Sequence, residues 1–100
     1  MLFRSYSASK AAVRNLARTW AVDLKGTGIR VNVLSPGATA TELAKEALGA
    51  EGQKAFATMT PLQRMADPAE IGAVAAFLAS PDSSFMTASE VAVDGGLAQL

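Results

Sequence analysis

The sequence of 100 residues contains neither cysteine nor histidine. Without cysteine, the chain has no disulfide bond, no thiolate nucleophile and no cysteine-ligated metal site. Without histidine, it lacks the usual general base near neutral pH and the commonest metal ligand, and a Ser-His-Asp triad cannot be assembled. Any acid–base chemistry must therefore use the single tyrosine, a lysine or a carboxylate.

An excess of charge of either sign is also missing, because nine lysine and arginine residues balance nine acidic residues. A chain without a positive excess is not expected to bind nucleic acid or an anionic membrane surface. Its longest strongly apolar stretch, 71–79, is far shorter than the roughly 20 residues that cross a bilayer. The apolar start is interrupted at Arg4 and Ser5, so it is not a signal peptide, and we expect a cytoplasmic protein.

The first half of the chain predicts a helix followed by a strand. Apolar residues recur at helical spacing over residues 6–25 and define one stripe: Val13, Leu16, Ala17, Trp20 and Leu24. Gly26 and Gly28 end this helix, because glycine adopts the left-handed geometry of a helix C-terminus without a Cβ penalty. The β-branched run 29–34 then indicates a strand, which the Ser-Pro-Gly sequence ending at residue 37 terminates.

The second half predicts helices and then a second strand. Residues 38–66 favour one or two short helices, capped at Thr41 and interrupted at Gly49 and Gly52. The Asp-Pro-Ala-Glu sequence 67–70 is typical of a capping box, with proline at the first helical position.

The helix that begins there has a predicted buried stripe of Ile71, Val74, Ala75 and Leu78. It is expected to end at the Ser-Pro-Asp sequence 80–82, and a short strand over about 90–94 precedes a Gly-Gly turn. Two apolar strands joined by a long helical crossover are expected to be parallel neighbours. Because a two-stranded sheet is marginal alone, we expect residues 1–100 to form a single partial domain of a larger α/β fold.

The motif with the clearest chemical meaning is YSASK, residues 6–10. On a helix, Tyr6 and Lys10 lie on one face, one turn apart. A tyrosine has an ordinary pKa of about 10, and a nearby ammonium lowers it, so that the phenol can exchange a proton with a carbonyl or alcohol oxygen. A surface pair near a helix start also explains the spacing, because such pairs arise often by chance.

Three longer segments place this motif in a wider pattern: YSASKAAVRNLARTWAVDLKGTGIRVNVLSPG, TPLQRMADPAEIGAVAAFLAS and EVAVDGG. Together, from about Tyr6 to Gly96, they resemble the C-terminal part of short-chain dehydrogenases/reductases. The resemblance implies the C-terminal part of a Rossmann-type doubly wound parallel sheet, incomplete as a standalone domain. It also implies an oxidoreductase that uses NAD or NADP to interconvert a small-molecule carbonyl and alcohol.

The resemblance assigns the catalytic and cofactor-binding residues. Tyr6 is similar to the catalytic acid/base, and Lys10 to its partner, which lowers the pKa of the tyrosine and hydrogen-bonds the nicotinamide ribose.

The remaining cofactor contacts that the resemblance implies follow the first strand. Pro36 and Gly37 resemble the turn beside the nicotinamide ring. A backbone group of Thr39 is expected at the carboxamide, and the hydroxyl of Thr41 at the carboxamide or the diphosphate. A strand-ending turn and a helix cap explain the same residues without a cofactor.

In the family, the segment equivalent to 38–66 varies and covers the substrate. Its small and apolar residues indicate an apolar lid or an ordinary surface helix pair: Ala40, Leu43, Ala47, Leu48, Phe56 and Met59.

Trp20 is interpreted as a core residue or a subunit contact, and not as a platform for a ligand. Small residues of the later helix allow a second subunit contact or ordinary helix–sheet packing: Gly72, Ala73, Ala76 and Ala79. The full-length protein is expected to be a homo-oligomer.

The Gly-rich pyrophosphate loop of the family is absent, because the only Gly-x-Gly sequence, 26–28, follows a helix and precedes a strand. Residues 1–5 do not resemble the family lead-in, and we expect a truncated reading frame or an assembly edge. Two hypotheses follow. Either this is the C-terminal catalytic portion of an oxidoreductase, inactive alone, or it is a non-catalytic remnant that acts as an oligomerisation or binding module.

Overall fold

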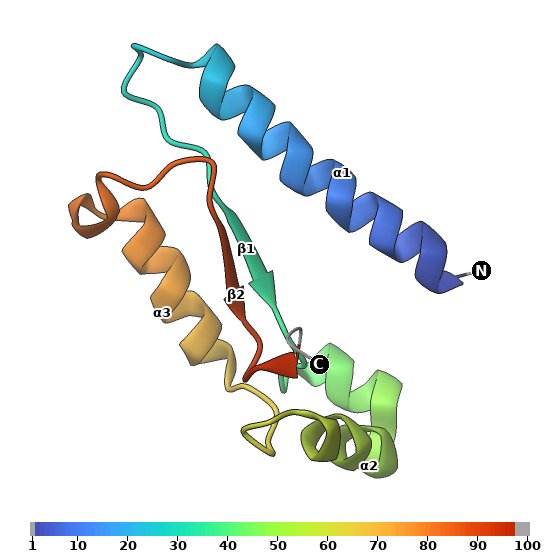
Figure 1. Cartoon of the computed structure of the whole chain (residues 1–100). Helices are drawn as coiled ribbons and strands as arrows, with labels where there is room; N and C mark the ends of the chain where they lie inside the picture. The colour runs from blue at the N-terminus through green and yellow to red at the C-terminus, as the bar shows by residue number, and fades with distance from the viewer. Residues whose placement is uncertain (1, 98–100) are drawn as a thin grey trace.

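The computed structural model describes the backbone of residues 2–97 and the side chains of residues 8–97 (Figure 1). The elements in chain order are α1 (Leu2–Asp23), β1 (Val33–Pro36), α2 (Glu42–Met59), α3 (Pro68–Ala79), the 3₁₀ helix η1 (Pro81–Ser83) and β2 (Glu90–Val93). The strands pair in parallel, in a register that runs from Val33 opposite Glu90 to Pro36 opposite Val93. The predicted α/β order and the parallel pairing are confirmed.

The strand pair lies between two helices. In Figure 1, α1 lies on one side of the strands and α3 on the other, while α2 lies beyond their carboxyl ends. α1 runs in the direction opposite to β1, so its N-terminal half lies toward the carboxyl end of that strand. This arrangement brings the YSASK segment to the sheet edge at which open α/β folds bind their ligands.

The start of β1 differs from the predicted strand 29–34, because the ladder with β2 begins only at Val33. Before that point the chain is bonded to the segment preceding β2 by one backbone hydrogen bond, from the N–H of Ala88 to the carbonyl of Val31 at 2.7 Å, and otherwise through side chains. The N–H of Val31 donates to Thr87 Oγ1 at 3.1 Å, and Asn32 Oδ1 accepts from the N–H of Ser89 at 3.2 Å. Ala88 adopts a φ of 58°, which breaks the extended geometry that a longer ladder would require.

Proline is predicted to end the strand, but Pro36 is itself the last residue of β1. The strand therefore ends directly after the proline and not before it. In a parallel ladder alternate residues donate to a given neighbour, and here Val33 and Gly37 donate to β2 and its flank. The missing N–H of Pro36 therefore removes no hydrogen bond to β2.

Arg30 connects the approach to β1 with the end of α3, a role that the sequence did not suggest. Its guanidinium donates to the carbonyl of Leu78 at 2.9 Å, that of Ser80 at 3.4 Å and that of Met86 at 3.1 Å. The last carbonyls of a helix have no partner within the helix, so a basic side chain at this position is favourable.

The segment 38–66 is closed at its base by two backbone hydrogen bonds. The N–H of Ala66 donates to the carbonyl of Ala38, and the N–H of Ala40 donates to the carbonyl of Ala66, both at 2.8 Å. α2 fills most of the segment and is kinked at Gly49, where φ is 65°. The predicted interruption at Gly49 is confirmed, whereas Gly52 continues the second half of the helix.

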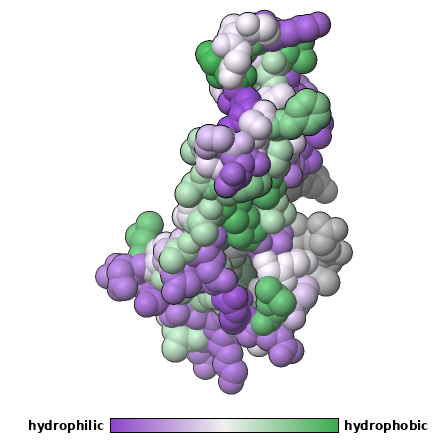
Figure 2. All heavy atoms as spheres, turned by 90° about the vertical axis from the view of Figure 1, so that its left-hand side faces the viewer, coloured by the Kyte–Doolittle hydropathy of each residue, from purple (hydrophilic) through white to green (hydrophobic). Residues whose placement is uncertain are grey.

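Few side chains are buried. Among the described residues, Ala17 is the one buried apolar side chain, at 3% exposed, and Trp20 is 51% exposed. The interpretation of Trp20 as core of this chain is therefore wrong, and its role as a subunit contact stays a prediction. Ala75 is exposed and does not belong to a buried stripe of α3. In Figure 2, which views the molecule from the side of α3, apolar residues form a band on the surface.

Gly37 offers a test of the strand pair, because a Cβ there would lie 2.7 Å from Asp94 Cα. We expect Gly37→Ala to lower the free energy of unfolding by about 1–3 kcal/mol, since backbone atoms must move. Gly72→Ala is the matched control, because no atom lies within 4 Å of a Cβ at that helical position. We expect it to add up to about 1 kcal/mol. Urea denaturation followed by circular dichroism measures both variants, and a Gly37→Ala variant as stable as the parent would contradict the close approach.

Candidate functional site

The carboxyl ends of β1 and β2 lie side by side because the strands are parallel. β1 continues into residues 37–41, and β2 continues into the Asp-Gly-Gly turn 94–96. The two continuations begin in contact, since the N–H of Gly37 donates to the carbonyl of Val93 at 3.0 Å. The residues after β1 that the sequence assigned to cofactor binding therefore share one sheet edge with the terminal glycines.

The segment between β1 and α2 folds on itself through local hydrogen bonds. Thr39 Oγ1 donates to the carbonyl of Gly37 at 3.0 Å, and the carbonyl of Thr39 accepts from the N–H of Thr41 at 2.8 Å. Thr41 Oγ1 accepts from the N–H of Ala44 at 3.1 Å and caps α2, as predicted. The hydroxyl proton of Thr41 remains available to donate to a ligand.

Lys10 lies on α1, half-buried, beside the first residues of β1. It lines a hollow of about 220 Å³ whose other lining residues come from α1, β1 and β2: Ser9, Val13, Val33, Leu34, Ser35 and Glu90. Among the described residues, Pro36, Gly37, Thr39 and Thr41 do not line this hollow. The structure thus places Lys10 against the sheet face, Pro36 at the end of β1, and the other cofactor candidates of this segment beyond that end.

The backbone of Tyr6 lies in α1, one helical turn before Lys10, as the sequence predicts. The side chain of Tyr6 lies outside the described residues. The shared helix face of the two residues follows from their spacing alone.

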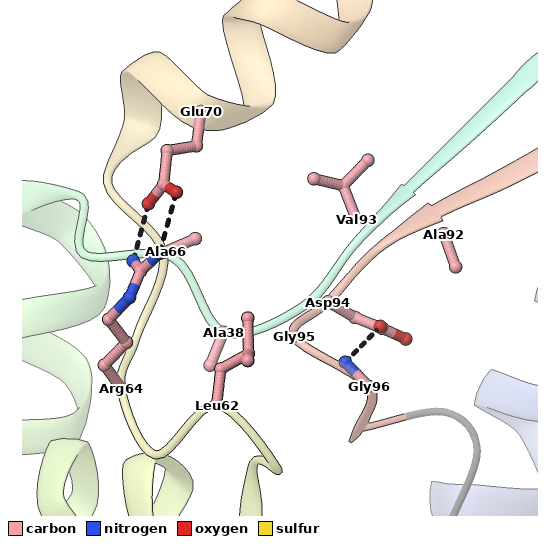
Figure 3. Close-up of a pocket in the computed structure, with 10 residues that line it drawn as sticks. All are labelled: Ala38, Leu62, Arg64, Ala66, Glu70, Ala92, Val93, Asp94, Gly95 and Gly96. Carbon is pink, nitrogen blue, oxygen red and sulfur yellow. Dashed lines mark hydrogen bonds and ion pairs between the residues drawn. The ribbon is translucent and has the colours of Figure 1, made fainter.

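A second hollow, of about 380 Å³, opens where the strands end (Figure 3). Its walls include the end of β2, Ala38 after β1, and an ion pair between Arg64 and Glu70 that the sequence did not suggest. Arg64 Nη1 and Nη2 contact the two oxygens of Glu70 at 2.6 and 2.8 Å, and Glu70 Oε1 also accepts from the N–H of Asp67 at 2.9 Å. The last of these bonds belongs to the capping box of α3, which confirms that prediction.

The carboxyl group of Glu70 titrates far below its ordinary range. The hydrogen bond from Arg64 lowers its pKa most, the N–H of Asp67 lowers it further, and together they bring the pKa from 4.5 to about 2. Desolvation opposes this change but is outweighed. The same contact raises the pKa of Arg64.

The terminal glycines pack against the end of the segment 38–66. A Cβ on Gly95 would lie 2.6 Å from Thr60 Cγ2, and one on Gly96 would lie 2.9 Å from Pro61 Cγ. The carbonyl of Gly95 accepts from the N–H of Leu62 at 3.2 Å. Both glycines have positive φ angles, so this turn requires glycine for its backbone geometry as well as for space.

In the described part of the chain, no group of three or more acidic side chains is arranged to hold a metal ion. No helix in the same range is long and apolar enough to cross a membrane.

Comparison with known families identifies one that spans nearly the whole chain. The profile of a family described as enoyl-(acyl carrier protein) reductase matches residues 3–98. Oxidoreductase asL5 of Sarocladium schorii is 70% identical over 95 residues, which are 95% of this chain and 38% of that protein. Galactitol 2-dehydrogenase (L-tagatose-forming) of Cereibacter sphaeroides is 47% identical, and the match covers 92% of this chain and 37% of that enzyme.

Solved structures with the same arrangement are short-chain dehydrogenases. A short chain dehydrogenase/reductase family protein superposes with a TM-score of 0.81 at 47% identity, covering 93% of this chain and 37% of that one. A short chain dehydrogenase family protein from Francisella tularensis superposes with a TM-score of 0.88 at 33% identity, covering 95% and 43%. The chain therefore spans less than half the length of these relatives.

The low pKa of Glu70 predicts a pH dependence of stability. A carboxyl group whose pKa falls on folding stabilises the fold above its ordinary pKa, here 4.5, and that contribution is lost as the pH falls through about 2. We therefore expect the difference in unfolding free energy between the parent and Glu70→Gln to be constant above pH 4.5 and to vanish near pH 2. The substituted glutamine side chain retains an acceptor for the N–H of Asp67, so the comparison isolates the charge. Urea denaturation at a series of pH values measures it, and a difference that does not change with pH would refute the ion pair.

Proposed function

Because the chain belongs to the short-chain dehydrogenase/reductase family, we propose that it carries the acid–base pair of an NAD(P)-dependent oxidoreductase. The proposed reaction interconverts a carbonyl and an alcohol on a small molecule. The observation that carries the proposal is the position of Lys10 on α1 beside β1, with Tyr6 one turn closer to the helix start. The match of the family profile over residues 3–98 supports the same assignment.

In the proposed mechanism Tyr6 exchanges a proton with the substrate oxygen. In the reductive direction its phenol gives a proton to the oxygen as the carbonyl carbon becomes an alcohol carbon, and in the oxidative direction its phenolate takes that proton back. Lys10 places a positive charge one helical turn away, which favours the phenolate because an adjacent ammonium lowers the pKa of a phenol. Bound NAD(P) supplies or accepts the hydride.

We propose that the end of β1 and the residues after it hold a nicotinamide cofactor. Pro36 and Gly37 would lie beside the nicotinamide ring. A backbone group of Thr39 would contact the carboxamide, and the hydroxyl of Thr41 the carboxamide or the diphosphate. The hydroxyl proton of Thr41 supports this, because the oxygen already accepts from the N–H of Ala44 and the hydroxyl can still donate. A helix N-terminus in that position also favours an anionic group.

We further propose that the segment 38–66 covers the substrate. Its base is fixed to the sheet by the hydrogen bonds of Ala38 and Ala40 with Ala66, while most of the segment projects beyond the strand ends. Leu43, at 77% exposed, and Met59, at 57% exposed, are available to meet an apolar substrate. A lid of this kind excludes water from the reacting carbon.

A second candidate function is favoured by the exposed apolar surface. Val13, Leu16 and Trp20 are each about half exposed along α1. A chain with so little buried apolar surface can act as an oligomerisation or binding module without catalysis. If the chain is instead part of a homo-oligomeric enzyme, the same surface meets other parts of that enzyme.

The catalytic assignment is tested in a hybrid enzyme, in which this chain replaces the 95 matched residues of the Sarocladium schorii oxidoreductase. Tyr6→Phe removes the exchangeable proton, and we expect the rate of NAD(P)H oxidation with a panel of ketones and aldehydes to fall about 100- to 10,000-fold. Lys10→Ala should also lose most activity, whereas Lys25→Ala, after the helix end, is the matched control and should not. An active Tyr6→Phe hybrid would refute the role of the phenol.

The isolated chain provides a separate prediction. We expect NADH to cause no saturable quenching of Trp20 fluorescence after inner-filter correction, because the sequence holds no Gly-rich loop to receive the pyrophosphate. The hybrid enzyme is the control and should bind NADH. Saturable quenching of the isolated chain would show that residues 1–100 suffice for cofactor binding and would count against a separate cofactor-binding portion.

A further inference from the structure

A polar cluster joins α1 to both strands on the sheet face that α1 covers. Glu90 opens β2 opposite Val33, and its two carboxylate oxygens have different partners. Oε2 forms an ion pair with Arg14 Nε, and Oε1 accepts from Ser35 Oγ at 3.1 Å. One acidic side chain therefore pairs with a charged helix residue and accepts a hydrogen bond from a β1 residue. The buried Nε of Arg14 makes no hydrogen bond, so its contact with Glu90 is one of charge.

The cluster adjoins the proposed catalytic lysine. Lys10 and Arg14 are four residues apart in α1 and so share one helix face. Lys10, Ser35 and Glu90 line the same hollow of about 220 Å³. Tyr6 lies one further turn toward the helix start, so the spacing puts all three α1 residues in one row.

Apolar packing does little to set the rotation of α1 about its own axis. Of the described α1 side chains, Ala17 alone is buried, and a methyl group tolerates rotation of the helix above it. Val13, Leu16 and Trp20 are 52%, 46% and 51% exposed. Because successive helical residues are about 100° apart, rotation by one residue would carry Lys10 and Arg14 off the sheet face together.

We infer that Glu90 is a positioning residue for the proton-transfer pair. By bonding Arg14 and Ser35, it fixes which face of α1 is turned to the sheet, and it thereby sets where Lys10 and Tyr6 lie. This inference rests on the proposed function of Lys10. The side chains of Arg14 and Glu90 remain 43% and 30% exposed, so their contribution is to orientation more than to stability.

The first test observes Lys10 directly in the 100-residue chain. Reductive methylation with ¹³C-formaldehyde labels Lys10, Lys25, Lys45 and Lys54 and keeps their charge. Glu90→Gln retains the acceptor for Ser35 but loses the charge opposite Arg14, and Arg14→Met loses the same contact from the other side. We expect both variants to shift the Lys10 dimethylammonium resonance and to leave the other three in place.

Two matched variants control this experiment. Arg14→Lys keeps a cation within reach of Glu90 and is expected to restore the parent resonance. Arg18→Met removes the same side chain one turn further along α1, where no ion pair is present among the described residues, and is expected to change nothing. A Lys10 resonance that is unchanged in both Glu90→Gln and Arg14→Met would overturn the inference.

The hybrid enzyme supplies the functional readout. We expect Glu90→Gln and Arg14→Met to slow the reaction about tenfold or more, because a misplacement of about 1 Å in a reacting group costs up to about 100-fold. Arg14→Lys should recover most of that loss. If Lys10→Ala leaves the hybrid active, the proposed function fails. If Lys10→Ala inactivates it while Glu90→Gln changes neither rate nor resonance, the positioning role alone fails.

Discussion

Parallel pairing of β1 with β2 brings together segments from opposite halves of the chain, and the other features depend on it. The pairing places the continuation of β1 against the Asp-Gly-Gly turn and leaves both sheet faces to be covered by helices. It tolerates no side chain at Gly37, where the backbone of Asp94 comes too close for a Cβ. The site at the strand ends therefore exists only while this register is kept.

Polar contacts at element ends, more than an apolar core, fix the helices on this sheet. Arg30 bonds three carbonyls at the end of α3 and in the turn that follows η1, and Arg64 with Glu70 fixes the start of α3. The ion pair between Glu90 and Arg14 adds a contact between β2 and α1. The hydrogen bonds of Arg30 and Arg64 are directional, so they specify orientation even where buried apolar area is small.

The sequence was sufficient to predict features that depend on local chemistry. The capping box at Asp67, the cap at Thr41 and the kink at Gly49 each follow from residues within one helical turn, and all three are present. The resemblance that the YSASK, Pro-Gly and Asp-Gly-Gly sequences carry was likewise confirmed at the level of family and fold.

Features that depend on distant partners could not be predicted in this way. The first residue of β1 is set by Thr87 and Ser89, and the exposure of Trp20 depends on which other elements pack against α1. The hydrogen bonds of Arg30 span 48 to 56 residues and that between Ser35 and Glu90 spans 55, and no local pattern encodes them.

The two hydrogen bonds that close the base of segment 38–66 have an evolutionary consequence. They make the segment an insertion between fixed ends, with Ala38 and Ala40 on one side and Ala66 on the other. Closing a longer loop between the same ends is thermodynamically inexpensive, at about 0.6 kcal/mol for each doubling of length. Within the segment, α2 lies before the contacts of Thr60, Pro61 and Leu62 with the terminal glycines, so α2 can change in length and composition without disturbing the strand register.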